Sequence, residues 1–294
     1  MTVLVVGDVV DDISVRPLEP TTPASDTAAE IRHHPGGSAA NVAAWLGRLG
    51  VATRFVGRVG ADAVERHARA LAAHGVDARL AADHERSTAT IVLQLDDTGE
   101  RTMFVDRGAN GALGEADVPP DGWDDVTWLH LTGYTFFDPA TRPLGRALIA
   151  TARERGVRIS IDPSTVSFLR VCGGATFLQW VEGADVLMPN LAEARVLVDA
   201  RGPHVDLDAL AARVPHVVVT LGRMGAAYLS APQAGGVREQ VTAPRIDVVD
   251  TTGAGDAFAA GWISAWLREP DPRAALEAGR VAAERCITAP GARP

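Results

Sequence analysis

Short, mostly apolar runs alternate with longer segments of helix-forming composition along most of the chain. The apolar runs are Val3 to Val6, Val126 to Leu131, Arg158 to Ile161, Val186 to Met188 and Val217 to Thr220. Runs of this length are typical of strands buried in a parallel sheet. The helical segments between them are Ala39 to Leu49, Ala63 to Ala73, Ala140 to Arg155, Glu193 to Val198 and Leu207 to Val214. This order predicts an α/β fold with helices on both faces of the sheet, in which ligands bind beyond the carboxyl ends of the strands.

Two segments break this alternation. Residues 13–35 are rich in Pro and Thr, whereas residues 87–106 alternate between polar and apolar positions around a turn at residues 96–99. The second segment predicts a β-hairpin. Two β excursions from one face of the sheet could meet as a small lid, although two unrelated surface loops would give the same pattern. The expected division is a main domain of residues 1–12, 36–86 and 108–294 and a β lid of residues 13–35 and 87–107.

Composition limits the possible partners and the compartment. A chain of 294 residues favours one large domain with a smaller appendage. A net charge of −9 argues against nucleic acid or an anionic membrane as the main partner, because both require a basic surface. Cys172 and Cys286 are too few for a disulfide framework. No signal peptide is recognisable, and no run approaches the roughly 18 apolar residues of a membrane span. We therefore expect a cytoplasmic protein with neither nucleic-acid nor membrane partners.

The chain contains no lysine. A Walker A loop, a protein-kinase-type site and Schiff-base chemistry all depend on a lysine, so each is excluded. If this protein binds nucleotide phosphates, it must do so with backbone amides, arginines and metal.

The most informative motif is the run DTTGAGD at residues 250–256. Small residues followed by a helix N-terminus allow a phosphate to approach unpaired backbone amides, and these carry partial positive charge. Asp256 belongs to the same motif, within reach of a phosphate bound at these amides, and could take a proton from an attacking hydroxyl. The alternative is an ordinary strand-to-helix turn with Asp256 as the N-cap, and the glycines alone do not decide between the two interpretations.

A second glycine cluster, GGSAAN, occupies residues 36–41. Gly36 and Gly37 permit close backbone approach, and Asn41 offers a donor and an acceptor to a hydroxyl-rich ligand. A small-residue helix packed on a sheet would look the same. Carboxylates follow the first strand, where Asp12 could accept hydrogen bonds from sugar hydroxyls, while Asp8 is equally suited to capping a turn.

Together these two motifs resemble the signature motifs of the ribokinase-like, or PfkB, family of carbohydrate and nucleoside kinases. Three further landmarks occur in the matching order: Asp162-Pro163, Asn190 to Glu193, and Thr220 to Gly225. The resemblance covers essentially the whole chain. It implies a three-layer α/β/α sandwich with a mostly parallel central sheet and a small β-sheet lid. The implied activity is transfer of the γ-phosphate of ATP to a hydroxyl, expected to be primary, of a small sugar or nucleoside.

The resemblance also assigns roles to matching positions. Asp256 corresponds to the catalytic base, and Gly253, Ala254 and Gly255 correspond to the anion hole. Asn190 and Glu193 match the element that orients phosphates and the water shell of Mg²⁺. The nucleotide loop is matched by Thr220, Gly222 and Gly225, and the sugar site by Asp12, Gly37 and Asn41. Asp250 and Thr252 match part of a monovalent-cation site, so K⁺ dependence is conceivable. The lid of some members forms a homodimer interface, which we also expect here.

Two positions depart from ribokinase itself. Ser38 stands where ribokinase has a lysine, and Arg107 is a candidate substitute, which could equally contact the substrate or anchor the hairpin. His130 lies in the strand where ribokinase has a sugar-binding glutamate, which puts ribose in doubt. A histidine among apolar residues is more often buried than catalytic.

Several alternatives to a neutral-sugar or nucleoside kinase stay open. A sugar acid of the 2-keto-3-deoxygluconate type could bind through Arg107, whereas a phosphorylated sugar is disfavoured because no tight basic cluster marks a second phosphate site. A non-catalytic sugar-binding protein on the same fold would have no need of Asp256. A dinucleotide-dependent oxidoreductase lacks the expected Gly-x-Gly-x-x-Gly after the first strand.

Overall fold

A computed structural model describes residues 1–95, 101–202 and 204–294. Among these residues, nine strands form the central sheet in the order β13-β12-β11-β10-β9-β8-β1-β4-β5. The strands are β1 (Thr2–Val6), β4 (Thr53–Gly60), β5 (Val76–Asp83), β8 (Val126–Thr132), β9 (Arg158–Asp162), β10 (Val186–Leu187), β11 (His216–Thr220), β12 (Ala226–Ser230) and β13 (Arg238–Val241). Neighbouring strands from β5 across to β11 pair parallel, whereas β12 pairs antiparallel with both β11 and β13. The expected mostly parallel sheet is confirmed.

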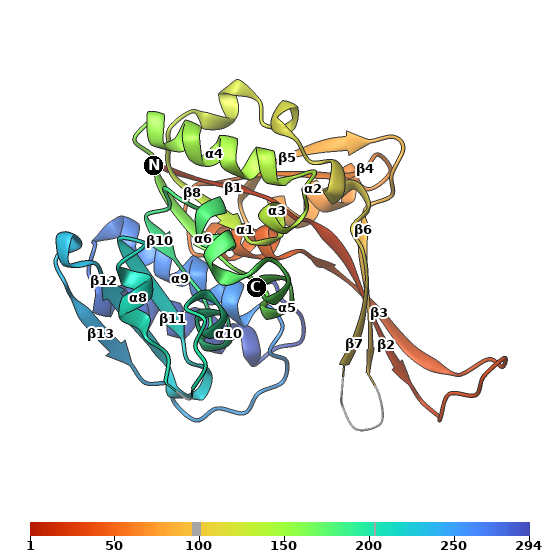
Figure 1. Cartoon of the computed structure of the whole chain (residues 1–294). Coiled ribbons are helices and arrows are strands. Elements are labelled where there is room, and N and C mark those ends of the chain that lie inside the picture. The colour runs from red at the N-terminus through yellow and green to blue at the C-terminus, as the bar shows by residue number, and fades with distance from the viewer. Residues whose placement is uncertain (96–100, 203) are drawn as a thin grey trace.

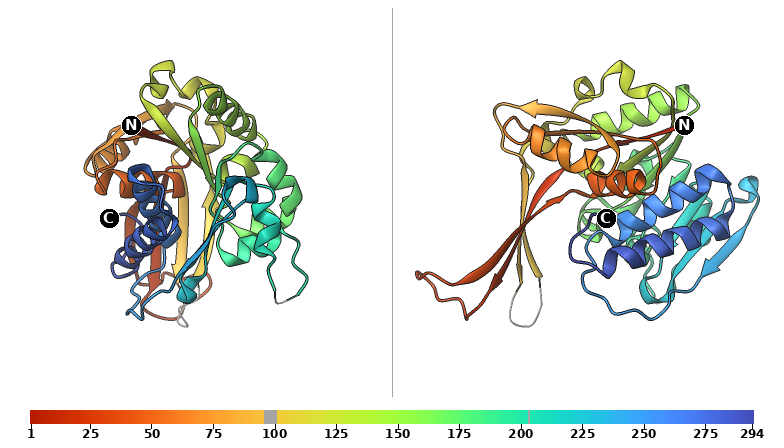
Figure 2. Two further views of the ribbon diagram at one scale, coloured as in Figure 1. Left: turned by 90° about the vertical axis from the view of Figure 1, so that its left-hand side faces the viewer. Right: turned by 180° about the vertical axis from the view of Figure 1, so that it is seen from behind.

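Helices cover both faces of the sheet (Figure 2). One face is packed by α1 (Ser38–Arg48), α2 (Val64–Ala72), α9 (Ala254–Arg268) and α10 (Pro272–Ile287). The other face is packed by α3 (Tyr134–Phe137), α4 (Arg142–Glu154), α5 (Val166–Cys172), α6 (Gly174–Trp180), α7 (Leu191–Leu197) and α8 (Leu207–Ala211). Strand β1 shows why its sequence is continuously apolar: Val3 and Val5 belong to the first core, whereas Leu4 and Val6 belong to the second. The three-layer α/β/α arrangement is confirmed.

The hydrophobic pattern did not identify four strands, β4, β5, β12 and β13. In β4, the charged residues Arg54 and Arg58 interrupt the apolar run and make ion pairs with Asp77 and with the buried Asp83 of β5. Strands that face water on one side or lie near an edge lose the continuous apolar signal on which the prediction relied.

The two β excursions form one separate sheet with the order β3-β2-β6-β7, which projects from the body of the molecule in Figure 1. Its strands are β2 (Val10–Pro17), β3 (Ala29–Gly36), β6 (Ala89–Leu95) and β7 (Arg101–Asp106). Strands β6 and β7 pair antiparallel, which confirms the predicted hairpin, and β2 joins β6 by a parallel ladder. The predicted turn at residues 96–99 lies outside the described residues. Because β2 begins at Val10, Asp12 lies within a lid strand, and the division into main domain and lid stays a proposal.

Candidate active site

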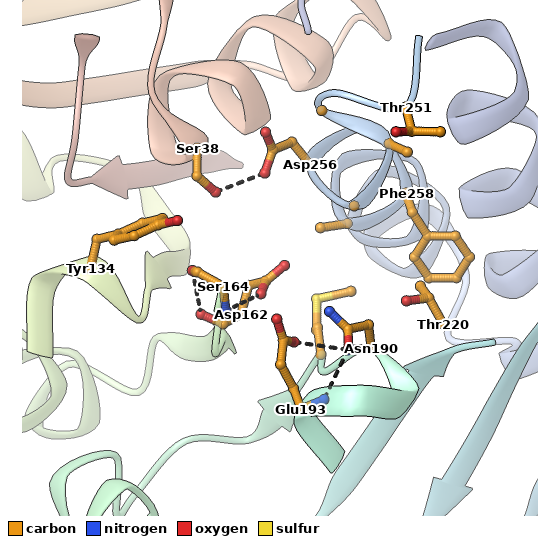
Figure 3. A pocket seen from close by; sticks show the side chains of 15 residues that line it. Ser38, Tyr134, Asp162, Ser164, Asn190, Glu193, Thr220, Thr251, Asp256 and Phe258 are labelled. Atoms are coloured by element: carbon orange, nitrogen blue, oxygen red, sulfur yellow. Dashed lines mark hydrogen bonds between the residues drawn. The ribbon is translucent and has the colours of Figure 1, made fainter. Parts of the chain in front are cut away.

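The two glycine motifs meet at the carboxyl ends of the central strands. Ser38 and Asp256 are 218 positions apart in sequence, yet the hydroxyl of Ser38 donates to Oδ1 of Asp256 at 2.7 Å. The side-chain nitrogen Nδ2 of Asn41 donates to Oδ2 of Asp256 at 2.9 Å. Figure 3 shows Ser38 and Asp256 on one side of the cavity beside them, which has a volume of about 280 Å³. The cavity is lined by Ser38, Tyr134, Asp162, Ser164, Met188, Asn190, Glu193, Thr220, Thr251, Gly253, Ala254, Gly255, Asp256, Phe258 and Ala259.

Asp256 lies in the first turn of α9 and does not cap it. The N-cap is Gly253, whose φ of 77° is a left-handed conformation that favours glycine. The carboxylate of Asp256 binds Ser38 and Asn41 of another helix instead of the amides of its own. The interpretation of Asp256 as an N-cap is therefore wrong. Burial raises the pKa of Asp256 to about 8, assisted by the negative charges of Asp162 and Asp8 and opposed by the two hydrogen bonds.

The start of α9 presents backbone amides ahead of the helical hydrogen-bond ladder. The first i to i−4 hydrogen bond at this end runs from the amide of Ala257 to the carbonyl of Gly253 (2.9 Å), so the amides of Gly255 and Asp256 precede the helical ladder. A Cβ on Gly255 would meet nothing within 4 Å, whereas a Cβ on Gly253 would lie 2.6 Å from the Cβ of Ala292. Gly253 is thus required by packing, and Gly255 leaves open space beside the amides.

Asn190 and Glu193 form the opposite wall through a capping box at the start of α7. Oδ1 of Asn190 accepts from the amide of Glu193, and Oε2 of Glu193 accepts from the amide of Asn190, both at 2.9 Å. Burial raises the pKa of Glu193 to about 7, opposed by the hydrogen bonds to Asn190. Burial and the charge of Glu193 raise the pKa of neighbouring Asp162 well above its ordinary value.

A divalent cation would relieve the repulsion between Asp162 and Glu193. Mg²⁺ is commonly bound by one or two carboxylates together with phosphates and water, and this pair supplies such ligands. Within the described residues, no three His, Cys, Asp or Glu side chains gather closely enough to hold a metal by themselves. The donor set therefore fits an ion that is completed by a nucleotide. Asp162 had been noted only as a landmark after a strand.

A larger cavity of about 1250 Å³ adjoins the first beyond Asn190 and Thr220. It is lined by Asn190, Leu191, Ala192, Thr220, Leu221, Gly222, Arg223, Gly225, Ala243, Pro244, Arg245, Ile246, Val248, Thr251, Ala254, Gly255, Phe258, Arg280, Ala283, Glu284 and Ile287. Four of the predicted nucleotide residues, Asn190, Thr220, Gly222 and Gly225, thus line this cavity, whereas Glu193 lines the smaller one. The reason for a glycine at Gly225 is structural, because a Cβ there would lie 1.9 Å from the carbonyl oxygen of Val241.

Of the predicted acceptor residues, Asn41 contacts Asp256 directly, Gly37 precedes Ser38 at the start of α1, and Asp12 lies against Gly36 at the base of the lid. Gly37 has a φ of 95°, and its missing Cβ would approach the carbonyl oxygen of Asp8 to 2.6 Å. The carboxylate of Asp8 accepts from the amides of Ser38 (2.6 Å) and Ala39 (3.2 Å), so Asp8 satisfies the first amides of α1, where the sequence had suggested only the cap of a turn. Burial and the charge of Asp8 raise the pKa of Asp12 to about 6.

Asp250 and Thr252 lie next to each other before the anion hole. Oδ1 of Asp250 accepts from the amide (3.0 Å) and the hydroxyl (2.7 Å) of Thr252, and Oδ2 accepts from the amide of Gly291 (3.2 Å). These bonds shape the loop from which α9 begins.

Comparison with known proteins identifies the family. The model of the pfkB family of carbohydrate kinases matches residues 2–294. The chain belongs to this PfkB family. An ATP-dependent ribose-1-phosphate kinase from Halopiger xanaduensis is 35% identical over 94% of this chain and 88% of that protein. A fructokinase from Vibrio alginolyticus is 31% identical over 92% of this chain and 85% of that protein. The crystal structure of adenosine kinase from Sinorhizobium meliloti superposes with a TM-score of 0.86 at 26% identity, covering 99% and 95% of the two chains.

This PfkB-family chain is therefore a sugar or nucleoside kinase, and the structure gives the contacts of Arg107 and His130. The guanidinium of Arg107 donates from Nη2 to the carbonyl of Tyr134 (3.3 Å) and pairs through Nε with Asp138 (3.4 Å). These are the contacts of an anchor for the hairpin. His130 is fully buried, its Nδ1 lies 2.8 Å from the hydroxyl of Ser160, and burial lowers its pKa to about 3, so it is a neutral core residue.

Sequence reasoning missed four residues that the PfkB-family fold brings to the site: Asp162, Ser164, Tyr134 and Arg293. Asp162, Ser164 and Tyr134 follow the ends of β9 and β8, and the rule that ligands gather at the carboxyl ends of parallel strands could have found them. No local signal distinguishes Arg293 from other arginines.

Proposed function

We propose that this chain transfers the γ-phosphate of ATP to a hydroxyl group of a small sugar or nucleoside, with Asp256 as the base. The observation that carries the proposal is the position of Asp256 at the start of α9, beside backbone amides and opposite Asn190 and Glu193 across one cavity (Figure 3). Phosphoryl transfer requires mainly in-line positioning and charge neutralisation, and this arrangement supports both.

Asp256 would accept the proton of the acceptor hydroxyl as its oxygen attacks the γ-phosphorus and the bond to the ADP oxygen breaks. The raised pKa makes the carboxylate a stronger base than an ordinary aspartate. Ser38 and Asn41 would hold it in place through their hydrogen bonds. The amides at Gly253 and Gly255 would stabilise the charge on the transferring phosphoryl group, where each such contact is worth roughly 2.7–4 kcal/mol in comparable oxyanion sites. The amide of Ala254, also predicted for this role, donates to the carbonyl of Thr251 at 3.3 Å.

We propose that ATP occupies the larger cavity, with its phosphates directed past Asn190 and Thr220 toward Asp256. Apolar residues such as Ile246 and Val248 suit a nucleobase, while Arg223 supplies positive charge in a chain without lysine. Mg²⁺ would be held by Glu193, through water, and by Asp162, and when bound would neutralise phosphate charge.

A K⁺ site at Asp250 and Thr252 is part of the proposal, and activity in KCl compared with tetramethylammonium chloride tests it.

The acceptor would bind between Asp12, Gly37 and Asn41. Alternatives are a sugar acid of the 2-keto-3-deoxygluconate type and a non-catalytic sugar-binding role. A coupled assay for ADP with ribose, fructose, 2-keto-3-deoxygluconate, ribose-1-phosphate, adenosine and pseudouridine separates them. A ligand that raises Tm without any ATP turnover would favour the binding role.

Asp256→Asn is the decisive variant. Loss of the base should lower kcat by roughly 10²–10⁴-fold while the Kd for ATP, measured by calorimetry, stays nearly unchanged. The matched control is Asp199→Asn, since Asp199 is an exposed aspartate beyond α7. A variant Asp256→Asn with normal kcat would refute the mechanism.

We also propose a homodimer formed through the lid. Large apolar side chains are exposed on its strands, among them Ile31, Met103, Phe104 and Val105. Exposed apolar groups that gather on one small sheet are typical of an interaction surface.

Among the described residues, no helix combines the length and hydrophobicity needed to cross a membrane. Location in the cytoplasm stays a prediction.

A further inference from the structure

Arg293, in the segment after α10, contacts the acceptor-side glycine motif. Its Nε donates to Oδ1 of Asn41 at 3.1 Å, and its Nη2 donates to the carbonyl oxygen of Gly36 at 2.7 Å. The third nitrogen, Nη1, is buried and has no hydrogen-bond partner in the described part of the chain. A guanidinium group therefore lies within the predicted acceptor site.

The segment before Arg293 is held from several sides. The carbonyl of Ala292 accepts from Nε1 of Trp45 in α1 at 2.9 Å, and the amide of Gly291 donates to Asp250 at 3.2 Å. Close contact of Ala292 with Gly253 joins this segment to the anion-hole loop. The backbone thus places Arg293 relative to both motifs.

The contact with Arg293 determines how the carboxamide of Asn41 is oriented. Because the Nε–H of Arg293 is a donor, the atom of Asn41 that faces it is the oxygen. The NH₂ group of Asn41 then faces Asp256 and donates to its Oδ2 at 2.9 Å. A flipped carboxamide would turn its oxygen toward the carboxylate and its NH₂ toward the guanidinium, and both contacts would be repulsive.

Arg293 keeps its charge in this environment. Burial lowers its pKa to about 10, and the negative charges of Asp12, Asp256 and Asp8 oppose that shift. The group is therefore protonated at neutral pH. The carboxylates around it come from β2, from α9 and from the turn after β1, so a single cation is surrounded by acidic groups of three elements.

We propose that Arg293 is a positioning residue for phosphoryl transfer, which holds the Asn41 carboxamide so that its NH₂ group faces Asp256. This inference rests on the proposed function for the role of Asp256 as the base. The same guanidinium supports the Gly36 turn, and the free Nη1 donors are available to an oxygen of the acceptor, because buried donors normally find a partner.

Kinetics of Arg293→Met and Arg293→Lys test the proposal. Methionine keeps the bulk of the side chain but cannot donate, so kcat should fall about tenfold or more, while the Kd for ATP changes little. Lysine keeps the charge and an N–H donor group but lacks the planar fork that reaches Asn41 and Gly36 together, so it should retain part of kcat. Millimolar guanidinium chloride should restore activity to Arg293→Ala. The matched control is Arg285→Met, an exposed arginine in the last turn of α10, which should behave as wild type.

A second measurement does not depend on turnover. Titration of the ¹³C-labelled Asp256 carboxyl by NMR, assigned by its loss in Asp256→Asn, should show a higher pKa in Arg293→Met than in wild type. Asp8 and Asp162, which also act on Asp256, are unchanged in both proteins. An unchanged pKa together with an unchanged kcat would overturn the proposal and leave Arg293 a purely structural role. If wild type phosphorylates no acceptor, the proposed function fails, but the titration still decides the role of Arg293. Should Arg293→Met not fold, Arg293→Gln, which also removes the positive charge, serves for the same comparison.

Discussion

The carboxyl group of Asp256 shows how surroundings set the chemistry of one residue. Burial favours its neutral form, while hydrogen bonds from Ser38 and Asn41 favour its charged form, and burial prevails. The resulting pKa of about 8 suits a base that must hold and release a proton near neutral pH. The same pKa has a consequence for stability that can be measured without any substrate.

Between the ordinary carboxyl pKa near 4 and the folded value of about 8, the unfolded chain releases the proton of Asp256 and the folded chain retains it. Folding stability from this group therefore falls as pH rises, by up to roughly 1.4 kcal/mol per pH unit. The asparagine of Asp256→Asn cannot ionise, so we expect the Tm of this variant to exceed that of wild type by an amount that grows from pH 5 to pH 8. Thermal unfolding at several pH values checks this. A constant difference would mean that the pKa of Asp256 is ordinary.

Secondary-structure elements place the nucleotide residues through backbone geometry. Gly222 and Gly225 flank the short turn between β11 and β12, with φ of 58° and 98°. Only Gly225 is constrained by its neighbours, because a Cβ there would meet the carbonyl of Val241 in β13 at 1.9 Å, whereas one on Gly222 would meet nothing within 4 Å.

The two glycines form a matched pair for mutation. Gly225→Ala should lower the free energy of unfolding by about 3 kcal/mol or more and weaken ATP binding, since strain and overlap add. Gly222→Ala should lower it by only about 1 kcal/mol, the usual strain of a left-handed alanine. Urea denaturation and calorimetry with ATP measure both effects. Equal losses in the two variants would show that the contact with Val241 is unimportant.

At the scale of the whole molecule, the lid is joined to the body through β2. Asp11 in this strand accepts from Nη2 of Arg66 in α2 at 2.8 Å. The next residue along the strand is Asp12, which we propose to bind the acceptor. The lid thus carries an acceptor residue and, by our proposal, the dimer interface. Association would then fix the position of Asp12 as well as cover apolar surface.

Phe104→Glu tests the dimer. Phe104 is 56% exposed on β7, and a charge there should abolish association by placing a carboxylate within an apolar interface. Sedimentation velocity should show a dimer for wild type and a monomer for this variant. Val171→Glu, at an apolar side chain that is 86% exposed on α5, a helix that is not part of the lid sheet, should remain a dimer. A wild-type monomer at micromolar concentration would contradict the proposal.

The sequence by itself determined those features that depend on neighbours along the chain. Buried strands such as β1 were predicted because consecutive apolar residues serve both faces of a covered sheet. The anion-hole loop was predicted because small residues and the start of a helix follow one another directly. The capping box of Asn190 and Glu193 is equally local, because it joins residues three positions apart, whereas the site role of this pair came from the family resemblance and stays a prediction.

Tertiary structure alone decided which distant groups meet. Strand β2 pairs with β6, Asp162 lies close enough to Glu193 to raise its own pKa, and Arg293 reaches Asn41 across 252 positions of sequence. Such contacts depend on how whole elements pack, and periodicity and spacing carry no information about packing partners. The interpretation of Asp256 as an N-cap failed for this reason, since its hydrogen bonds go to α1 and not to its own helix.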